Sequence, residues 1–330
     1  MSVSVQRHLE IGRDECHVWR VALDLPDDVT GCLHELLSVE ERTRAARFVF
    51  PSDGRRFIVA HGRLRQILGG YAGADPASLV IANGASGKPF LASPCAGLRF
   101  SLSHSGDTAL VAVAWDREVG VDLEAVRPLG DVLGLAASCF SPAERRALGA
   151  VPHKERLNCF FDGWTRKEAF LKLMGDGLSR PLDSFDVTLG PAEPARLMRV
   201  TGGRAGDCSL QAIEVGPGYR GALAAEGCLR LISLKDWVTR PEAGRSDGGR
   251  REGRHESLPG GGERRGAVLD LARGHGASER LACRRQERDE ERVPRVDQGG
   301  LDRHDAGEPA GLPPREELIL EVGIAAGVQP

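Results

Sequence analysis

Apolar and polar residues follow one another along the first 240 positions in a pattern that predicts a mixed α/β chain. Residues 16–24 alternate with the period of two that is typical of a strand, whereas 32–48 and 55–69 carry apolar residues at helical spacing. Short strand-like runs follow, separated by Gly, Pro, Asn or Asp, at 78–82, 98–103, 108–115 and 118–124.

The second part of this region repeats the same plan. A helix is expected to start at Ser141-Pro142, and a long helix is expected over 153–174. Strand patterns then recur at 184–189, 209–215, 219–225 and 228–234. The repetition predicts an α+β (mixed α/β) fold of two pseudo-symmetric halves, 1–115 and 116–240, with a cleft between them as the natural site.

The composition changes abruptly near residue 238. Residues 238–330 contain no Phe, Trp, Tyr or Lys, and Arg, Gly, Glu and Pro dominate. A segment of this kind buries too little apolar surface to offset the cost of ordering its backbone, about 1–2 kcal/mol per residue. We therefore expect 241–330 to be a largely disordered or non-homologous tail, with a short helix or strand only at 315–327. It is either a natural tail or, as we favour, coding sequence read out of its ancestral frame.

Charge and hydropathy exclude two broad classes of function. The 330 residues carry a net charge of −3, which argues against a nucleic-acid partner but allows one local basic pocket. No apolar run reaches the length of about 18 residues that a membrane span needs, and the N-terminus lacks the apolar core of a signal peptide. We expect a cytoplasmic protein without a membrane partner, and the self-contained halves predict a monomer.

Two acids lie in the strand-like segment Gly120-Val121-Asp122-Leu123-Glu124. Residues two apart on a strand share a face, so Asp122 and Glu124 project together. Neighbouring carboxylates repel each other unless a cation lies between them, and oxygen ligands favour Mg²⁺ or Mn²⁺ over zinc. We expect Asp122 to be an exposed carboxylate at a strand end. The alternative is two acids on a solvated strand face, and the pair alone favours that alternative.

Two further segments carry candidate chemistry. On the predicted helix, Trp164, Glu168 and Lys172 form one stripe, in which Glu168 could complete a metal site; the alternative is a surface helix with one Glu–Lys pair. Ser103 and His104 end a predicted strand and could donate hydrogen bonds to a phosphate or ribose, although a lone His is more often structural.

These motifs in this order closely resemble the 4′-phosphopantetheinyl transferase superfamily, in its two-halved, single-chain Sfp-like form. The resemblance runs from about residue 18 to residue 234 and depends on GKPF, FSLSHS, GVDLE, WTRKEAFLK and GLSRPLDSFDV. It implies an enzyme that moves the phosphopantetheine arm of coenzyme A onto a serine of an apo acyl or peptidyl carrier protein and releases adenosine 3′,5′-bisphosphate. The nucleophile then belongs to the partner. Carriers of polyketide, nonribosomal peptide and fatty-acid synthesis all fit this description.

The resemblance also implies roles for individual residues. Asp122, Glu124 and Glu168 would bind Mg²⁺, or Mn²⁺, at the pyrophosphate of coenzyme A, which agrees with the argument from paired carboxylates. Asp122 would thereby also contact the coenzyme, and Lys172 would neutralise charge that develops on the pyrophosphate. The 3′-phosphate and adenosine portion of coenzyme A would be held by Arg44, Arg56, Lys88, Ser103 and His104.

For the proton acceptor we favour Glu144, or a water that it orients, over Glu168. Glu144 matches a family position proposed to deprotonate the serine directly or through water, whereas Glu168 would act while bound to metal, which makes a carboxylate a poor base. Glu144 is also the third residue of a capping box that begins at Ser141, and this purely structural role is an equal alternative. A non-catalytic module that binds coenzyme A or a carrier protein is the alternative to the enzyme as a whole.

Overall fold

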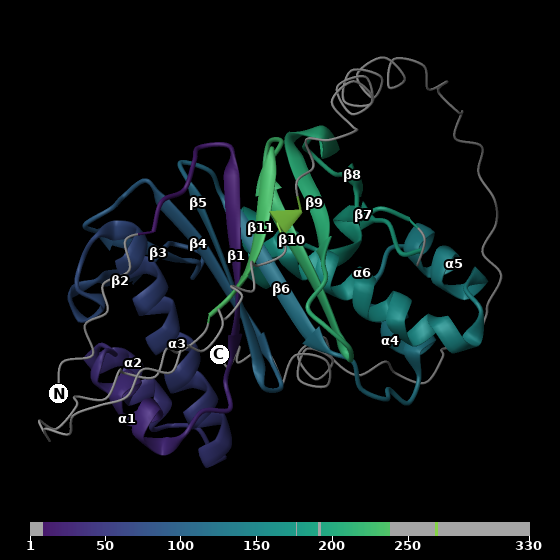
Figure 1. Cartoon of the computed structure of the whole chain (residues 1–330). Helices are drawn as coiled ribbons and strands as arrows, with labels where there is room; N and C mark the ends of the chain where they lie inside the picture. Colours follow the sequence, from purple (N-terminus) through teal and green to yellow (C-terminus); the bar gives the residue numbers. More distant parts are fainter. Residues whose placement is uncertain (1–8, 176, 191–192, 238–267, 270–330) are drawn as a thin grey trace, which may run out of the picture.

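The computed structural model describes residues 9–175, 177–190, 193–237 and 268–269. It confirms the expected α+β fold (Figure 1). Two sheets lie side by side in the middle of the molecule, and helices lie on the outer side of each (Figure 1). Of the stretch 241–330, only Val268–Leu269 is described; the rest of the predicted tail, including 315–327, lies outside the described residues.

The first sheet has five strands and draws on both ends of the described chain. Its spatial order is β12 (Val268–Leu269), β11 (Leu231–Asp236), β1 (Glu15–Ala22), β5 (Thr108–Trp115) and β4 (Leu98–Ser105). Strand β1 pairs antiparallel with β5 and parallel with β11. The segment 116–240 therefore contributes one strand, β11, to the sheet that otherwise comes from the first 115 residues and Val268–Leu269.

The second sheet has three antiparallel strands in the order β6 (Val119–Ala125), β10 (Tyr219–Glu226) and β9 (Cys208–Ile213). Two hairpin-like pairs lie apart from the sheets: β2 (Val80–Asn83) with β3 (Pro89–Ser93), and β7 (Phe185–Val187) with β8 (Leu197–Val200). The expected strand positions are confirmed to within a few residues, whereas β3, β8 and β12 were not expected.

The helices are α1 (Asp27–Glu35), α2 (Val39–Ala45), α3 (Pro51–Ala72), α4 (Val132–Cys139), α5 (Pro142–Ala150) and α6 (His153–Met174). Short 3₁₀ turns lie at Pro76–Ser78, Gly177–Ser179, Leu182–Ser184 and Ala205–Asp207. The single helix expected over 32–48 is wrong, because the Ser38 side chain accepts a hydrogen bond from the Glu41 N–H and starts a new helix there. The helix expected over 153–174 is confirmed.

Three apolar layers hold these elements together. Helix α3 packs Ile67 and its neighbours against one face of the first sheet. Val121 and Leu223 of the second sheet meet the opposite face of the first. Phe161 of α6 packs against the outer face of the second sheet at Ala222. The layer order is thus helix, sheet, sheet, helix, and the contact between the two sheets joins the halves. None of the described helices combines the length and the apolar character that a bilayer span needs.

Candidate active site

Strand β6 is buried on both faces. Val121 and Leu123 enter the core between the two sheets, so Asp122 and Glu124 project from the other face, against which α6 packs. Both acids are only 1 % exposed. The expectation that Asp122 is an exposed strand-end carboxylate is therefore wrong, because a helix that is distant in sequence covers this face of the strand.

Gly120 allows the helix to approach β6 closely. A Cβ atom at this position would lie 2.1 Å from the backbone oxygen of Ala169 and 2.3 Å from the backbone nitrogen of Leu173, both on α6. Any side chain at residue 120 would separate the helix from the strand. The absence of a side chain therefore brings the Glu168–Lys172 turn of α6 over the carboxylates of β6.

Three serines of β4 connect the first sheet to β6. The hydroxyl oxygens of Ser101, Ser103 and Ser105 accept hydrogen bonds of 3.0, 3.3 and 3.0 Å. The donors are the backbone N–H groups of Val121, Leu123 and Ala125. Because serines two apart meet N–H groups two apart, the strand register of one sheet fixes that of the other.

Two of these serines also hold the acids. The Ser103 hydroxyl donates to Asp122 Oδ1 at 2.9 Å, and the Ser105 hydroxyl donates to Glu124 Oε2 at 3.0 Å. Each hydroxyl thus donates to a carboxylate while it accepts from the backbone. The pair of acids is oriented by the neighbouring half of the molecule.

Helix α6 supplies the opposite side of the site. Lys172 Nζ lies 2.7 Å from Asp122 Oδ1, across 50 residues of sequence. Glu168 is partly buried one helical turn before Lys172, on the same stripe. The other oxygen of Asp122, Oδ2, is buried and has no hydrogen-bond partner among the residues that the structure describes. The site therefore contains one carboxylate oxygen whose polar demand these residues do not meet.

The acids of this site carry more negative charge than their surroundings compensate. Burial first, and then the charge of Asp122, raise the pKa of Glu124 to about 8. The same two causes raise the pKa of Glu168 to about 7, and the Lys172 ammonium opposes the shift in both. Asp122 thus acts on an acid of its own strand and on an acid of α6, and the site would be stabilised by a further cation.

The donor set suits a hard divalent cation. All available donors are carboxylate oxygens, one of them an unpartnered buried oxygen, which is the chemistry that Mg²⁺ and Mn²⁺ prefer. Among the residues that the structure describes, no three His, Cys, Asp or Glu side chains are already gathered closely enough to hold a metal ion. The acid side chains would therefore have to move closer together to bind an ion. In this structure the Lys172 ammonium provides the positive charge next to Asp122.

A group of basic side chains lies beside the acids. Burial first, and then the charges of His61, Lys172, Arg44 and Arg56, lower the pKa of His104 to about 4. Cations from α2, α3 and α6 therefore all face the region of His104. A polyanionic ligand here would meet positive charge from both halves of the chain.

Two of the predicted phosphate ligands already contact acids. Arg56 bonds Asp107 Oδ1 through Nε at 3.0 Å, and it also contacts Asp53 at 3.1 Å. Lys88 Nζ lies 2.5 Å from Glu118 Oε2 and 2.9 Å from the Leu173 carbonyl, near the end of α6. A cavity of about 520 Å³ lies beside Lys88, between the β2–β3 pair, β4 and that helix end.

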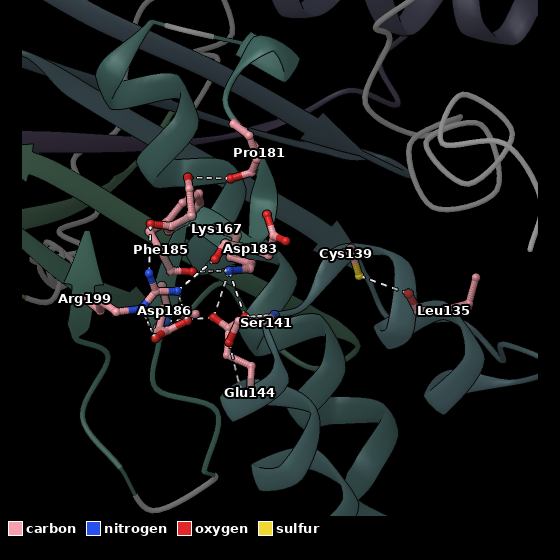
Figure 2. A network of polar contacts seen from close by, with 12 residues as sticks. Leu135, Cys139, Ser141, Glu144, Lys167, Pro181, Asp183, Phe185, Asp186 and Arg199 are labelled. Carbon is pink, nitrogen blue, oxygen red and sulfur yellow. Dashed lines mark hydrogen bonds and ion pairs between the residues drawn. The ribbon is translucent and has the colours of Figure 1, made fainter. Parts of the chain in front are cut away.

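Glu144 lies in a different polar network (Figure 2). Its two carboxylate oxygens accept hydrogen bonds from the N–H of Ser141 at 2.8 Å, the N–H of Val187 at 2.8 Å and the Lys167 ammonium at 2.8–2.9 Å. The capping box predicted for Ser141 and Glu144 is confirmed. Burial raises the pKa of Glu144, and the Lys167 charge opposes that shift.

Comparison with known proteins finds one family in both parts of the chain. Residues 118–224 match the model of the 4′-phosphopantetheinyl transferase superfamily, and residues 28–116 match the model described as 4′-phosphopantetheinyl transferase, N-terminal. The 4′-phosphopantetheinyl transferase HetI of Nostoc sp. is 43% identical over 192 residues, which are 58% of this chain and 81% of that protein. The chain belongs to the 4′-phosphopantetheinyl transferase superfamily.

Other members of the superfamily match over a similar extent. The 4′-phosphopantetheinyl transferase psf-1 of Bacillus pumilus is 33% identical and covers 63% of this chain and 89% of that protein. The 4′-phosphopantetheinyl transferase Sfp of Bacillus subtilis is 30% identical and covers 57% of this chain and 82% of that protein. The family expected from the sequence motifs is thereby confirmed.

The structure of this superfamily member brings most of the predicted site residues into one region. Asp122 contacts Lys172 directly and acts electrostatically on Glu124 and Glu168. The Lys172 charge acts on His104 as well. Glu144, in contrast, contacts the first turn of α5, the end of β7 and Lys167. The role predicted for each of these residues in the reaction stays a prediction.

Three residues that the sequence did not single out contact the predicted residues or the strand that carries them. Ser101 and Ser105 hold β6 and Glu124, and Lys167 holds Glu144. The alternating serines of the segment 101–105 were a visible signal, because identical polar residues two apart on a strand face a common partner. Lys167 had no such signal, since charged residues on a helix usually face solvent.

Proposed function

We propose that this protein transfers the 4′-phosphopantetheine arm of coenzyme A to a serine of an apo carrier protein and releases adenosine 3′,5′-bisphosphate. The observation that carries the proposal is the convergence of Asp122 with Lys172 and Glu168 from two segments about 50 residues apart. A cation-seeking group of acids beside a group of basic side chains fits a diphosphate ester that arrives with a metal ion. The membership of the chain in the superfamily supports the same reaction.

Asp122, Glu124 and Glu168 are the residues that would hold Mg²⁺, or Mn²⁺ in its place. The unpartnered Asp122 Oδ2 and the raised pKa values of the two glutamates support this assignment, because each reflects missing positive charge. When bound, the ion would draw charge from the pyrophosphate and make its β-phosphorus more electrophilic. Ser103 and Ser105 keep the Asp122 and Glu124 carboxylates in place for it.

The basic side chains would bind the phosphates and adenosine portion of coenzyme A. Arg44, His104 and Lys172 are the principal candidates, because the charges of Arg44 and Lys172 both act at the His104 imidazole. Arg56 and Lys88 are also proposed contacts, but each would have to share its charge between a phosphate and its present carboxylate partner. Ser103 contributes through Asp122, since its hydroxyl already donates to that carboxylate.

The reaction step requires a proton acceptor and a group that stabilises the leaving phosphate. The carrier serine oxygen bonds to the β-phosphorus, and the bond from that phosphorus to the bridging oxygen breaks. Glu144, which the sequence favoured, is 2 % exposed and both of its oxygens are occupied. A metal-bound carboxylate is a poor base, so our choice for the acceptor of the serine proton is a water that Glu168 orients and that passes the proton to solvent. The Lys172 ammonium compensates the charge left on the departing adenosine bisphosphate.

A panel of apo carrier proteins tests the proposal. Each carrier is incubated with the full-length protein, coenzyme A and MgCl₂, and its intact mass is measured, with EDTA and with the Asp122→Asn variant as controls. We expect one phosphopantetheine to be added to at least one carrier, and none with either control. Binding of coenzyme A or of a carrier without any mass increase would instead favour a non-catalytic binding module.

A further inference from the structure

Lys167 is a fully buried lysine that immediately precedes Glu168 on α6. Its side chain is 0 % exposed, and its ammonium contacts Glu144 Oε1 at 2.9 Å, Glu144 Oε2 at 2.8 Å and the Phe185 carbonyl oxygen at 2.8 Å. The same ammonium lies 4.2 Å from the centre of the Phe185 ring. Every donor direction is therefore used inside the protein, and Lys167 cannot touch a substrate.

Glu144 connects this lysine to two other elements (Figure 2). It accepts from the N–H of Ser141, where α5 begins, and from the N–H of Val187, at the end of β7. Lys167 and Glu144, hereafter the Lys167–Glu144 pair, thus join α6 to both α5 and β7. The pair is fully hydrogen-bonded, so its geometry has little freedom.

The contacts of the Lys167–Glu144 pair constrain the rotation of α6 at residue 167. Successive side chains on a helix differ in direction by about 100°, so fixing residue 167 fixes the direction of Glu168. The thiol of Cys139 on α4 lies close enough to Glu144 and to Glu168 that both charges act on it. Burial is the main cause that raises the pKa of this thiol to about 12. A misplacement of about 1 Å in a reacting site can lower a rate by about 10²-fold.

We propose that the Lys167–Glu144 pair is a positioning device, which sets the rotation of α6 so that Glu168 and Lys172 face the carboxylates of β6. The inference deepens the proposed function, because it takes Glu168 as a metal ligand. It assigns Glu144 a role that acts through Lys167 and α6 instead of one in which Glu144 touches the carrier serine. Both members of the pair are then positioning residues.

A merely structural role makes a different prediction from a positioning role. If the pair only stabilises the fold, any change that restores stability also restores metal binding and transfer. Buried ion pairs are often replaceable by apolar residues of similar volume without loss of stability. The double variant Lys167→Met/Glu144→Leu therefore separates the two roles, because it removes the charges and keeps the packing.

The experiment compares four variants of the full chain with the wild type. They are Lys167→Met, Glu144→Gln, the double variant, and Leu148→Ala, a matched control that creates a cavity on α5 and leaves the pair intact. For each, the melting temperature, the affinity for Mn²⁺ in the presence of coenzyme A (by electron paramagnetic resonance of free Mn²⁺), and kcat and KM for transfer are measured. Wild-type protein that binds Mn²⁺ and coenzyme A without transfer would contradict the proposed function alone, and the Mn²⁺ comparison would still test the pair.

We expect Glu144→Gln and the double variant to weaken Mn²⁺ binding by at least about 10-fold and to lower kcat by a similar factor. The double variant should melt near the wild-type temperature, whereas Leu148→Ala should melt lower with unchanged Mn²⁺ affinity. Three results would overturn the proposal. They are a double variant that recovers Mn²⁺ affinity, a Leu148→Ala variant that loses it equally, or a Glu144→Gln variant that loses transfer while its Mn²⁺ affinity is unchanged.

Discussion

Helix α6 contributes to two buried acidic groups whose electrostatic states are opposite. In the first, Glu144 receives four contacts, from Lys167 and two backbone N–H groups, and each charge is matched. In the second, Asp122 contacts the Lys172 ammonium but retains an oxygen without a partner among the described residues, and Glu124 lies only 3.6 Å from an Arg127 nitrogen. Neighbouring residues of one helix thus help to build both a satisfied ion pair and an unsatisfied cluster.

This difference separates structural acids from functional ones. A buried carboxylate that stabilises a fold collects donors until its charge is compensated. A carboxylate that binds a ligand is held in place with its charge uncompensated when the ligand is absent. This lowers the free energy of unfolding, and favourable contacts elsewhere in the fold offset the loss. Burial alone does not distinguish them, because Glu144 and Glu124 are 2 % and 1 % exposed.

The largest effect is expected at Asp122, on which the unsatisfied cluster centres. Asp122→Asn keeps the shape of the side chain but removes the negative charge, so kcat/KM should fall by at least about 10³-fold. The free energy of unfolding should stay equal or rise, because the repulsion on Glu124 and Glu168 is relieved. Asp162→Asn is the matched control: Asp162 is an acid of α6 that pairs with Arg220 at 3.2 Å, and its loss should leave transfer unchanged. Near-normal transfer by Asp122→Asn would place the reaction elsewhere.

The second prediction contrasts the stability of the two groups. Glu144→Ala leaves a buried ammonium without its partner, so the free energy of unfolding should fall by about 3–5 kcal/mol. Glu168→Ala removes a repelled charge, and its effect should stay within about 1 kcal/mol. Urea unfolding at pH 7.5 without divalent metal measures both. Equal losses in the two variants would show that the groups do not differ in the proposed way.

The third prediction concerns pH. The folded-state pKa values of Glu124 and Glu168, about 8 and about 7, lie above the ordinary value of 4.5. The folded state therefore holds protons that the unfolded state has lost, and stability should fall by about 2 kcal/mol between pH 6.5 and 8.5. His17, His61 and His104 have pKa values lowered to about 4 and act in the opposite direction up to about pH 7.5, where the unfolded histidines have lost their protons, so they offset part of the fall at the lower end of this range.

Magnesium provides the control for this slope. Urea unfolding is measured across the same pH range in EDTA and in MgCl₂ at equal ionic strength. Mg²⁺ should flatten the slope, because a bound cation favours the ionised acids. The raised pKa of Glu144 contributes with the same sign but should not respond to Mg²⁺. A slope that is identical with and without Mg²⁺ would contradict a cation site among these acids.

Local patterns were sufficient to predict the elements that carry the site. The periodicity of 153–174 gave the bounds of α6, and the alternation of 118–124 gave β6 to within one residue. Pairing between distant segments was not predictable in this way, because the alternation of a strand does not show which other strand it will pair with. The parallel pairing of β11 with β1 joins segments that are about 200 residues apart. The helix expected over 32–48 failed because the local cap at Ser38 outweighs the periodicity.

The same limit applies to the site. The spacing of Asp122 and Glu124 revealed their shared face, but their burial depends on α6, which packs over Gly120. The capping box at Ser141 already indicated that Glu144 could have a purely structural role. Its ion pair with Lys167, 23 residues further along the chain, is a second structural contact that the sequence did not reveal. Residue types and spacing thus identified which acids and bases could react. Which of their charges are paired could be read only from the folded structure.

The smallest effect is expected at Glu124, at the edge of the unsatisfied cluster. Its carboxylate accepts from Ser105 and lies 3.6 Å from an Arg127 nitrogen, so part of its charge is compensated already. Water readily replaces one carboxylate ligand around Mg²⁺, so Glu124→Gln should lower kcat only about 10-fold and raise the Mg²⁺ concentration needed for half-maximal rate. Initial rates over a series of MgCl₂ concentrations measure both quantities. If Glu124→Gln lowered kcat as much as Asp122→Asn does, the two acids of β6 would contribute equally to metal binding. The proposed difference between a partly compensated and an uncompensated acid would then be wrong for this cluster.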